Sequence, residues 1–337
     1  TLSALQMLLY VLIGNSVLEI KGMTFSYWMM LFTASCFANL LGLNISASFN
    51  SAKVIYILIP ILIIPQLLFS GVIVKFDKLY PLFASQTGVP WIGNIMASRW
   101  AYEGLAVNQY KNNEYEKHFF GFDKERKYSN WKKDYWVKEL QNKVNESRKY
   151  IKEETPERLS YSWGVIRNEL LKEQEFVAAL ELPDLPTIRT SEINNEILDN
   201  LEFALERLFD FYRDKYNRAA NEKEEYVMEL MDSEEGREAL IVMKDSFMNE
   251  SLEEFVTNKN ELEVIVEYNQ QLVQKSDLIY LTPRHHGFFG SHFYAPSKPI
   301  LGQQVTTYSA NLLVIWGMTL LLTLSLPHFN VYVITGF

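Results

Sequence analysis

The chain has 337 residues, of which 48% are hydrophobic and 22% charged, and its formal net charge is −9. This acidic balance argues against a nucleic-acid partner, because contacts to phosphates require a basic surface. Its single cysteine, Cys36, excludes an intrachain disulfide and a cysteine-based zinc site. The averages hide unlike regions: charges are scarce in residues 1–110 and 303–337 and dense in residues 111–275.

Residues 1–110 contain three predicted membrane helices, at residues 2–18, 25–47 and 54–74. None of the three carries a charge, and the third is long enough to cross the hydrocarbon core of a bilayer. Pro60 and Pro65 predict a bend in this helix, which neighbouring helices tolerate in a membrane. The chain opens on threonine without a basic region before its first apolar stretch, so we expect a fragment of a longer polypeptide.

Residues 90–105 are apolar and aromatic but too short to span a bilayer. Arg99 and Glu103 are four residues apart, which places both charges on one helical face. Charges at membrane depth are costly unless they are paired. The segment therefore predicts a helix that lies at the membrane surface or re-enters the membrane; an amphipathic helix of a soluble domain is the alternative.

Residues 111–302 predict an α-helical soluble insertion, since apolar residues recur there at helical spacing and strand-like alternation is nearly absent. Ser191 is the predicted N-cap of the longest helix. The expected helices cover residues 131–151, 165–180, 193–216, 240–247 and 262–272, with a break at Pro183–Pro186. Residues 279–302, rich in proline, glycine and aromatics, predict a structured loop that returns the chain to the membrane.

Residues 303–337 hold the last predicted membrane helix, at residues 305–326, and a short tail. The sequence thus predicts an all-α membrane protein. It has four membrane helices, one re-entrant helix and a large helical insertion.

Three segments resemble the membrane domain of ABC-2-type exporters, in particular the G-subfamily (the White and pleiotropic-drug-resistance group) and its bacterial relatives. They are NLLGLNISASFNSAK at residues 39–53, IPQLLFSGVIVKFDKL at 64–79 and VPWIGNIMASRWAYEGLAVNQY at 89–110. Phe69, Ser70 and Gly71 match the family's apolar-Phe-Ser-Gly helix ending. The matches to its re-entrant helix are Trp91, Arg99, Trp100, Glu103 and Leu105.

The resemblance implies the last four membrane helices of a half-transporter of the inner (plasma) membrane, with membrane lipid around it. A second copy would complete a homodimer, the helix at residues 54–74 would line the substrate path, and transport would proceed by alternating access. Residues 111–302 would be extracytoplasmic; loop charges do not set this orientation, so it rests on the resemblance. The resemblance also implies an ATP-binding cassette, either upstream in the same polypeptide or in a separate one, which would bind ATP and Mg²⁺. This chain itself has no G-x-x-x-x-G-K-[ST] loop to hold the phosphates of ATP.

The candidate site residues lie at the end of the helix at residues 54–74. Phe69, Ser70 and Gly71 form a candidate substrate gate, because apolar side chains can close a path by excluding water. The competing interpretation is a helix-end turn that uses glycine for its conformational freedom. Gln66 is a candidate substrate ligand or an interhelical hydrogen-bonding group. Arg99 and Glu103 are predicted to pair with each other, or with a neighbouring group, rather than to contact substrate.

A second hypothesis is a membrane-anchored interaction or sensor protein whose helical soluble domain binds a partner. An intramembrane hydrolase lacks a supporting polar pair, and no catalytic motif such as G-x-S-x-G occurs in the chain. His285, His286 and His292 invite a metal interpretation, but no H-E-x-x-H helix accompanies them. We therefore expect neither a catalytic site nor a metal site here.

Overall fold

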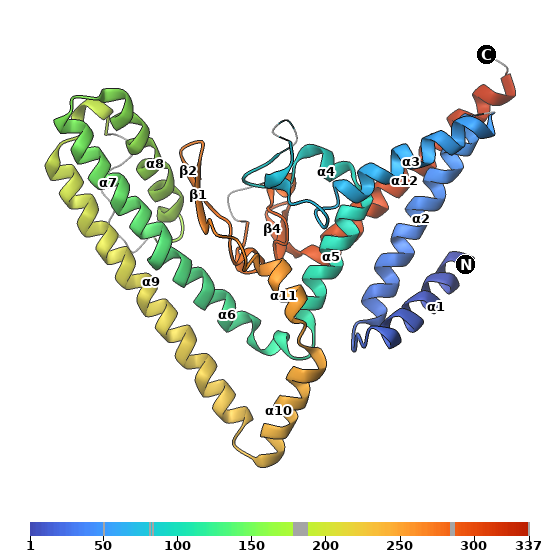
Figure 1. The fold of residues 1–337 in the computed structure, drawn as a ribbon, viewed down its shortest axis with the longest axis horizontal. Helices are drawn as coiled ribbons and strands as arrows, with labels where there is room; N and C mark the ends of the chain where they lie inside the picture. The colour runs from blue at the N-terminus through green and yellow to red at the C-terminus, as the bar shows by residue number, and fades with distance from the viewer. Residues whose placement is uncertain (50, 81, 83, 178–187, 284–286, 336–337) are drawn as a thin grey trace. The chain divides into compact units, whose positions relative to one another are not determined.

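The structure, a computed structural model, describes residues 1–335 except 50, 81, 83, 178–187 and 284–286. The chain divides into two compact units (Figure 1). The first comprises Thr1–His118, Ile241–Val256 and Thr282–Phe337, and the second comprises Phe119–Leu240 and Thr257–Leu281. These units differ from the predicted boundaries at residues 111 and 302, because residues 241–256 and 282–302 belong to the first unit.

The first unit is built on apolar helices: α1 (Leu2–Val17), α2 (Thr24–Ser48), α3 (Ala52–Leu68) and α12 (Thr307–Thr335). In the described part of the chain, α2 and the Thr307–Leu326 part of α12 are long and apolar enough to cross a membrane. The apolar stretches Leu2–Val17 and Lys53–Leu68 are shorter. Two of the four predicted spans therefore have the full length that a crossing requires.

Two predicted helices of this unit have different bounds in the structure. The helix expected at residues 54–74 ends at Leu68, although Pro60 and Pro65 lie inside it as predicted. The apolar run continues beyond the end of the helix, into a turn in which Gly71 adopts a left-handed conformation with φ +81°. Residues 90–105 do not form one helix: α4 (Trp91–Ile95) and α5 (Ala97–Asn112) are separated by an extended Met96.

Helices α2, α5 and α12, labelled in Figure 1, pack on one another. Met30, Trp100 and Ile315 form the buried centre of this contact. Farther along α12, Asn44 Nδ2 of α2 donates to the Leu322 carbonyl at 2.9 Å, and Ser325 Oγ donates to Asn44 Oδ1 at 2.9 Å. Such interhelical hydrogen bonds suit apolar surroundings, where polar groups have no water to bind.

Among the described residues, four short strands form two antiparallel hairpins, so the fold is mostly helical rather than all-α. β1 (Ile265–Tyr268) pairs with β2 (Gln271–Gln274), where a helix was expected at residues 262–272. Asn269 and Gln270 both have positive φ, as a two-residue type I′ turn requires. In the first unit, β3 (Ser297–Ile300) pairs with β4 (Gln303–Thr306), directly before α12.

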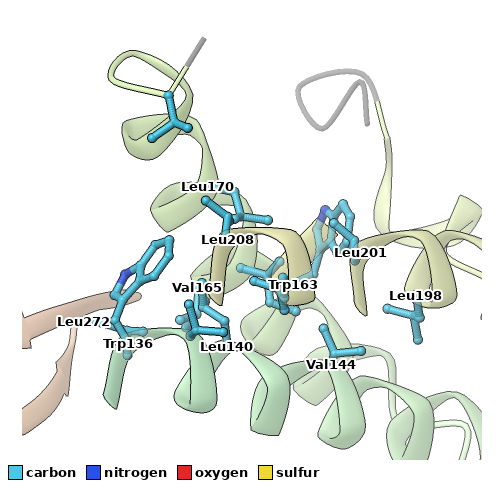
Figure 2. Close-up of a cluster of buried hydrophobic side chains, with 14 of the residues drawn as sticks. Trp136, Leu140, Val144, Trp163, Val165, Leu170, Leu198, Leu201, Leu208 and Leu272 are labelled. Atoms are coloured by element: carbon cyan, nitrogen blue, oxygen red, sulfur yellow. The ribbon is translucent and has the colours of Figure 1, made fainter. Parts of the chain in front are cut away.

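The second unit is a helical bundle. Its main helices are α6 (Glu116–Trp131), α7 (Val137–Lys152), α8 (Pro156–Gln174) and α9 (Asn195–Leu230), and α10 (Glu234–Phe247) continues into the first unit. Leucine, valine and tryptophan side chains of α7, α8 and α9 form its core (Figure 2). The predicted Ser191 cap is wrong, because Asn194 caps α9 by accepting from the Ile197 amide. Leu180 and Pro183–Pro186 lie outside the described residues.

A π-helical turn at Lys132–Trp136 joins α6 to α7 and places a lysine in the bundle core. Lys132 Nζ lies 3.6 Å from the Trp136 ring centroid and pairs with Glu173, which also accepts from the Tyr212 hydroxyl. Because every charge in this contact has an opposite partner, the burial of Lys132 is compensated.

Candidate functional site

The candidate gate residues Phe69, Ser70 and Gly71 lie in the turn that ends α3. Ser70 Oγ donates to the Leu67 carbonyl at 2.7 Å and accepts from the Val72 amide at 3.3 Å. A Cβ on Gly71 would lie 2.7 Å from the Phe293 ring, so a larger residue would collide with it. The turn therefore requires glycine for both its conformation and its close packing.

Gln66 joins α3 to the start of α5. Its Oε1 accepts from the Ser98 amide at 3.1 Å, and its backbone carbonyl accepts from Ser98 Oγ at 2.5 Å. The Ser98 amide belongs to the first turn of α5, where backbone N–H groups have no partner within the helix. The interhelical alternative for Gln66 is thus the contact that the structure contains, and it fixes the two helices to each other near the Gly71 turn.

Arg99 and Glu103 form the predicted pair on α5. Arg99 Nη2 lies 3.4 Å from Glu103 Oε2, and the two side chains are 1% and 0% exposed. The Arg99 guanidinium carbon also lies 3.9 Å from the Trp100 ring centroid, a distance at which a cation is attracted to the ring face. Because both side chains are almost completely buried, the stability of this ion pair depends on the other groups that bind the Glu103 carboxylate.

Three further groups bind Glu103, and the sequence did not indicate any of them as its partners. Lys298 Nζ of β3 lies 3.0 Å from Oε1, and the Tyr294 amide donates to the same oxygen at 3.2 Å. Asn311 Nδ2 of α12 donates to Oε2 at 2.9 Å. One carboxylate therefore joins α5, the segment before α12, and α12 itself. We call these residues (Arg99, Glu103, Tyr294, Lys298 and Asn311) the Glu103 cluster.

The Glu103 cluster contains two cations and one carboxylate, so positive charge is in excess. Lys298 is 0% exposed, and the Nε and Nη1 atoms of Arg99 have no hydrogen-bond partner in the described part of the chain. Burial, with Arg99 adding to it, lowers the pKa of Lys298 to about 8 although Glu103 opposes the shift. Burial alone would raise the pKa of Glu103, but Arg99 and Lys298 outweigh it and the pKa is lowered.

Aromatic residues of the return segment, which we define as residues 287–306, cover the cluster. Phe288 stacks on Trp100 with ring centroids 5.7 Å apart, and Phe293 packs edge-on against Phe76 at 5.1 Å. A Cβ on Gly88 would lie 3.0 Å from the Gly290 carbonyl oxygen. The return segment thus contacts the end of α3, the chain between α3 and α4, and α5.

A metal site in the described part of the chain would require several ligating side chains close together. No three His, Cys, Asp or Glu side chains are placed to hold a metal ion there. His285 and His286 lie outside the described residues, and His292 is 8% exposed. The described side chains instead join the end of α3, the start of α5 and the start of α12 through polar contacts.

Comparison with known proteins identifies the kind of domain to which these helices belong. Residues 1–110 match the family model of the ABC-2 type transporter. No curated protein and no solved structure matched the chain.

The chain therefore carries a transporter membrane domain in its first third. Its residues 1–110 are an ABC-2 type transporter membrane domain, which implies the permease component of an ABC transporter. Such membrane domains typically act with an ATP-binding cassette component. The resemblance noted from residues 39–110 is confirmed at this level, and the match extends it to the first helix.

Proposed function

We propose that this chain is the permease part of an ATP-driven exporter of the G-subfamily type. Two copies form the substrate path by pairing in the inner (plasma) membrane, and ATP and Mg²⁺ bind to the cassette. When ATP binding closes the cassettes, the membrane helices of the two copies rock against each other. This motion opens the substrate path to one side of the membrane at a time, which is alternating access. The observation that carries the proposal is the ABC-2 match over residues 1–110, which contain α3 and the Gly71 turn.

The path is proposed to follow α3. Its described apolar side chains are largely exposed within one copy, for example Ile57 at 66% and Leu67 at 53%. Apolar side chains that find no partner in their own chain are expected to face lipid or a second copy. Phe69 remains the proposed gate residue at the end of this helix, next to a turn that Gln66 fixes to α5.

The experiment combines the purified chain with its cassette in lipid nanodiscs and measures vanadate-sensitive ATP hydrolysis. We expect the chain to co-elute with the cassette and to raise its hydrolysis rate above that of the cassette alone. A cassette lacking its phosphate-binding lysine is the control. A chain that neither binds the cassette nor changes its rate would refute the proposal.

The side of the second unit is tested separately. We propose that this unit is extracytoplasmic. The exposed Ser160→Cys, in a Cys36→Ala background, should react with a membrane-impermeant maleimide in cells whose inner membrane is intact. Reaction only after the inner membrane is permeabilised would reverse the topology.

A membrane-anchored interaction or sensor protein is the second candidate. The observation that favours it is the second unit, which has its own hydrophobic core on α7, α8 and α9. In that case the second unit binds a partner and the cassette is not needed. This candidate is favoured if the chain does not change ATP hydrolysis by the cassette but binds a specific soluble partner.

A further inference from the structure

Two attachments of the return segment differ in chemistry. At one, the Phe293 ring occupies the space that the missing side chain of Gly71 leaves at the end of α3. At the other, Lys298 binds the buried Glu103 carboxylate of α5 at 3.0 Å. The segment therefore links the end of α3 to α5 through side chains that lie only five positions apart.

We propose that the return segment is a latch on the end of α3, which the Lys298–Glu103 ion pair closes. In this proposal Lys298 and Phe293 are positioning residues for the translocation path, and the latch opens during each ATP-driven cycle. The inference rests on the proposed function, since the latch acts on the helix that is proposed to line the path.

The first argument concerns the charge of the Glu103 cluster. A buried ion pair stabilises a fold less than apolar side chains of similar size would, because both charges lose their hydration. This cluster has one cation more than it can pair, and two nitrogens of Arg99 have no partner among the described residues. The Lys298–Glu103 contact therefore contributes little net stability to the fold. It is better suited to holding the return segment in one position from which the segment can be released.

The second argument concerns the geometry at α3. Phe293 also packs against Phe76, and Phe76 lies 2.9 Å from the position of a Cβ on Gly71. The turn after α3 is therefore held between two phenylalanine rings. Movement of the α3 end must displace Phe293, and the Lys298 contact holds the backbone that carries Phe293 in place.

The third argument concerns α12, which begins at Thr307 directly after β4. Thr307 Oγ1 donates to the Ala295 carbonyl at 2.5 Å, and Asn311 donates to both Glu103 and the Trp100 carbonyl at 2.9 Å. The start of α12 is thus bound to the same segment and to the same carboxylate. Release of Lys298 would remove the ion pair that holds the return segment to α5 and leave the weaker Tyr294 amide contact to Glu103, while Asn311 keeps α12 on α5.

The test uses a buried reporter in the return segment. Ser291 is 1% exposed, and Ser291→Cys is nearly isosteric; the native Cys36 is replaced by alanine. The complete transporter, with its cassette, is reconstituted in nanodiscs and treated with N-ethylmaleimide, with and without ATP, Mg²⁺ and vanadate. Mass spectrometry gives the rate of modification. We expect slow modification without nucleotide and a rate about tenfold higher in the vanadate-trapped state, as for a local opening.

Variants then separate the latch from general loosening. Lys298→Met should be modified rapidly in both states, and Lys298→Arg should restore the nucleotide dependence. Phe293→Ala removes no charge and should also abolish the dependence, so it carries the test if Lys298→Met does not fold. Gln303→Ala, at an exposed position of β4, is the matched control and should behave as the parent.

The outcomes distinguish the latch from the proposed function. A transporter with vanadate-sensitive ATP hydrolysis, but with the same modification rate in both states, would overturn the latch alone. Retention of the full nucleotide response in both Lys298→Met and Phe293→Ala would also overturn it. Absence of ATP hydrolysis that depends on the chain and its cassette would overturn the proposed function and the latch together.

Discussion

Replacing Glu103 by glutamine removes the only negative charge of the Glu103 cluster while keeping the size of the side chain. Arg99 and Lys298 then remain buried without an anion, and the new amide nitrogen faces donors instead of acceptors. Removing one partner of a buried ion pair costs about 3–5 kcal/mol of folding free energy. At roughly 2–4 °C per kcal/mol for a unit of this size, the midpoint of thermal unfolding should fall on the order of 10 °C.

The assay is thermal unfolding of the purified chain in detergent, followed by scanning fluorimetry. Glu114→Gln is the matched control, because Glu114 is 50% exposed and its ion pair with Lys117 is on the surface. It should change stability by less than about 1 kcal/mol. If the unfolding midpoint of Glu103→Gln equals that of the control, the claim that the Glu103 carboxylate holds α5, the return segment and α12 together is refuted.

A compensating variant tests the same reasoning from the other side. In Arg99→Met, Glu103→Leu, Lys298→Met all three charges are removed together, so no unpaired charge stays buried. We expect the triple variant to be more stable than Glu103→Gln, because well-packed apolar residues replace buried ion clusters at little cost. A triple variant less stable than Glu103→Gln would show that packing, and not charge, determines stability here.

Three further predictions concern other contacts. The folded chain holds the pKa of Lys298 near 8, below the ordinary 10.5, so the unfolded chain binds more protons between these values. Stability of the wild type relative to Lys298→Met should therefore rise as pH increases through this window, by on the order of 3 kcal/mol; equal denaturation midpoints at pH 7.5 and 10 would contradict this. Gly71→Ala should cost about 2–4 kcal/mol through its positive φ and the contact with Phe293, and Phe293→Leu should recover part of that loss. Glu173→Gln should leave Lys132 unpaired in the second unit and raise hydrogen exchange in α8 and α9; unchanged exchange would show that the network is not stabilising.

Helices α7, α8 and α9 of the second unit could be predicted because each carries its own apolar periodicity, whereas α6 (Glu116–Trp131) was not predicted. The apolar stripe at residues 193–216 lies on α9, whose Leu201, Leu205 and Leu208 are fully buried. The β1–β2 hairpin was missed because its strands are four residues long and its turn uses Asn269 and Gln270 rather than Asn-Gly. Asn269 was the available signal, since asparagine tolerates positive φ.

The site was predictable only where its residues are close in sequence. Arg99 and Glu103 are one helical turn apart, so their pairing follows from spacing. Lys298 and Asn311 lie 195 and 208 residues from Glu103, and no local pattern relates them. The only signal in the sequence was that Lys298 precedes an apolar helix and that Asn311 lies inside it. The end of α3 was predicted too late because hydrophobicity continues past Leu68, although a helix-end turn at Gly71 was one of the two interpretations of this segment.

The most direct test of the central claim, that paired copies of this permease move with ATP, is a distance between copies. Leu67→Cys, exposed near the end of α3, is spin-labelled in the Cys36→Ala background of the complete transporter in nanodiscs. Pulsed electron paramagnetic resonance should give a defined distance between the two labels, and that distance should change when ATP, Mg²⁺ and vanadate are added. Absence of dipolar coupling between copies, or a distance that ATP leaves unchanged, would contradict the account.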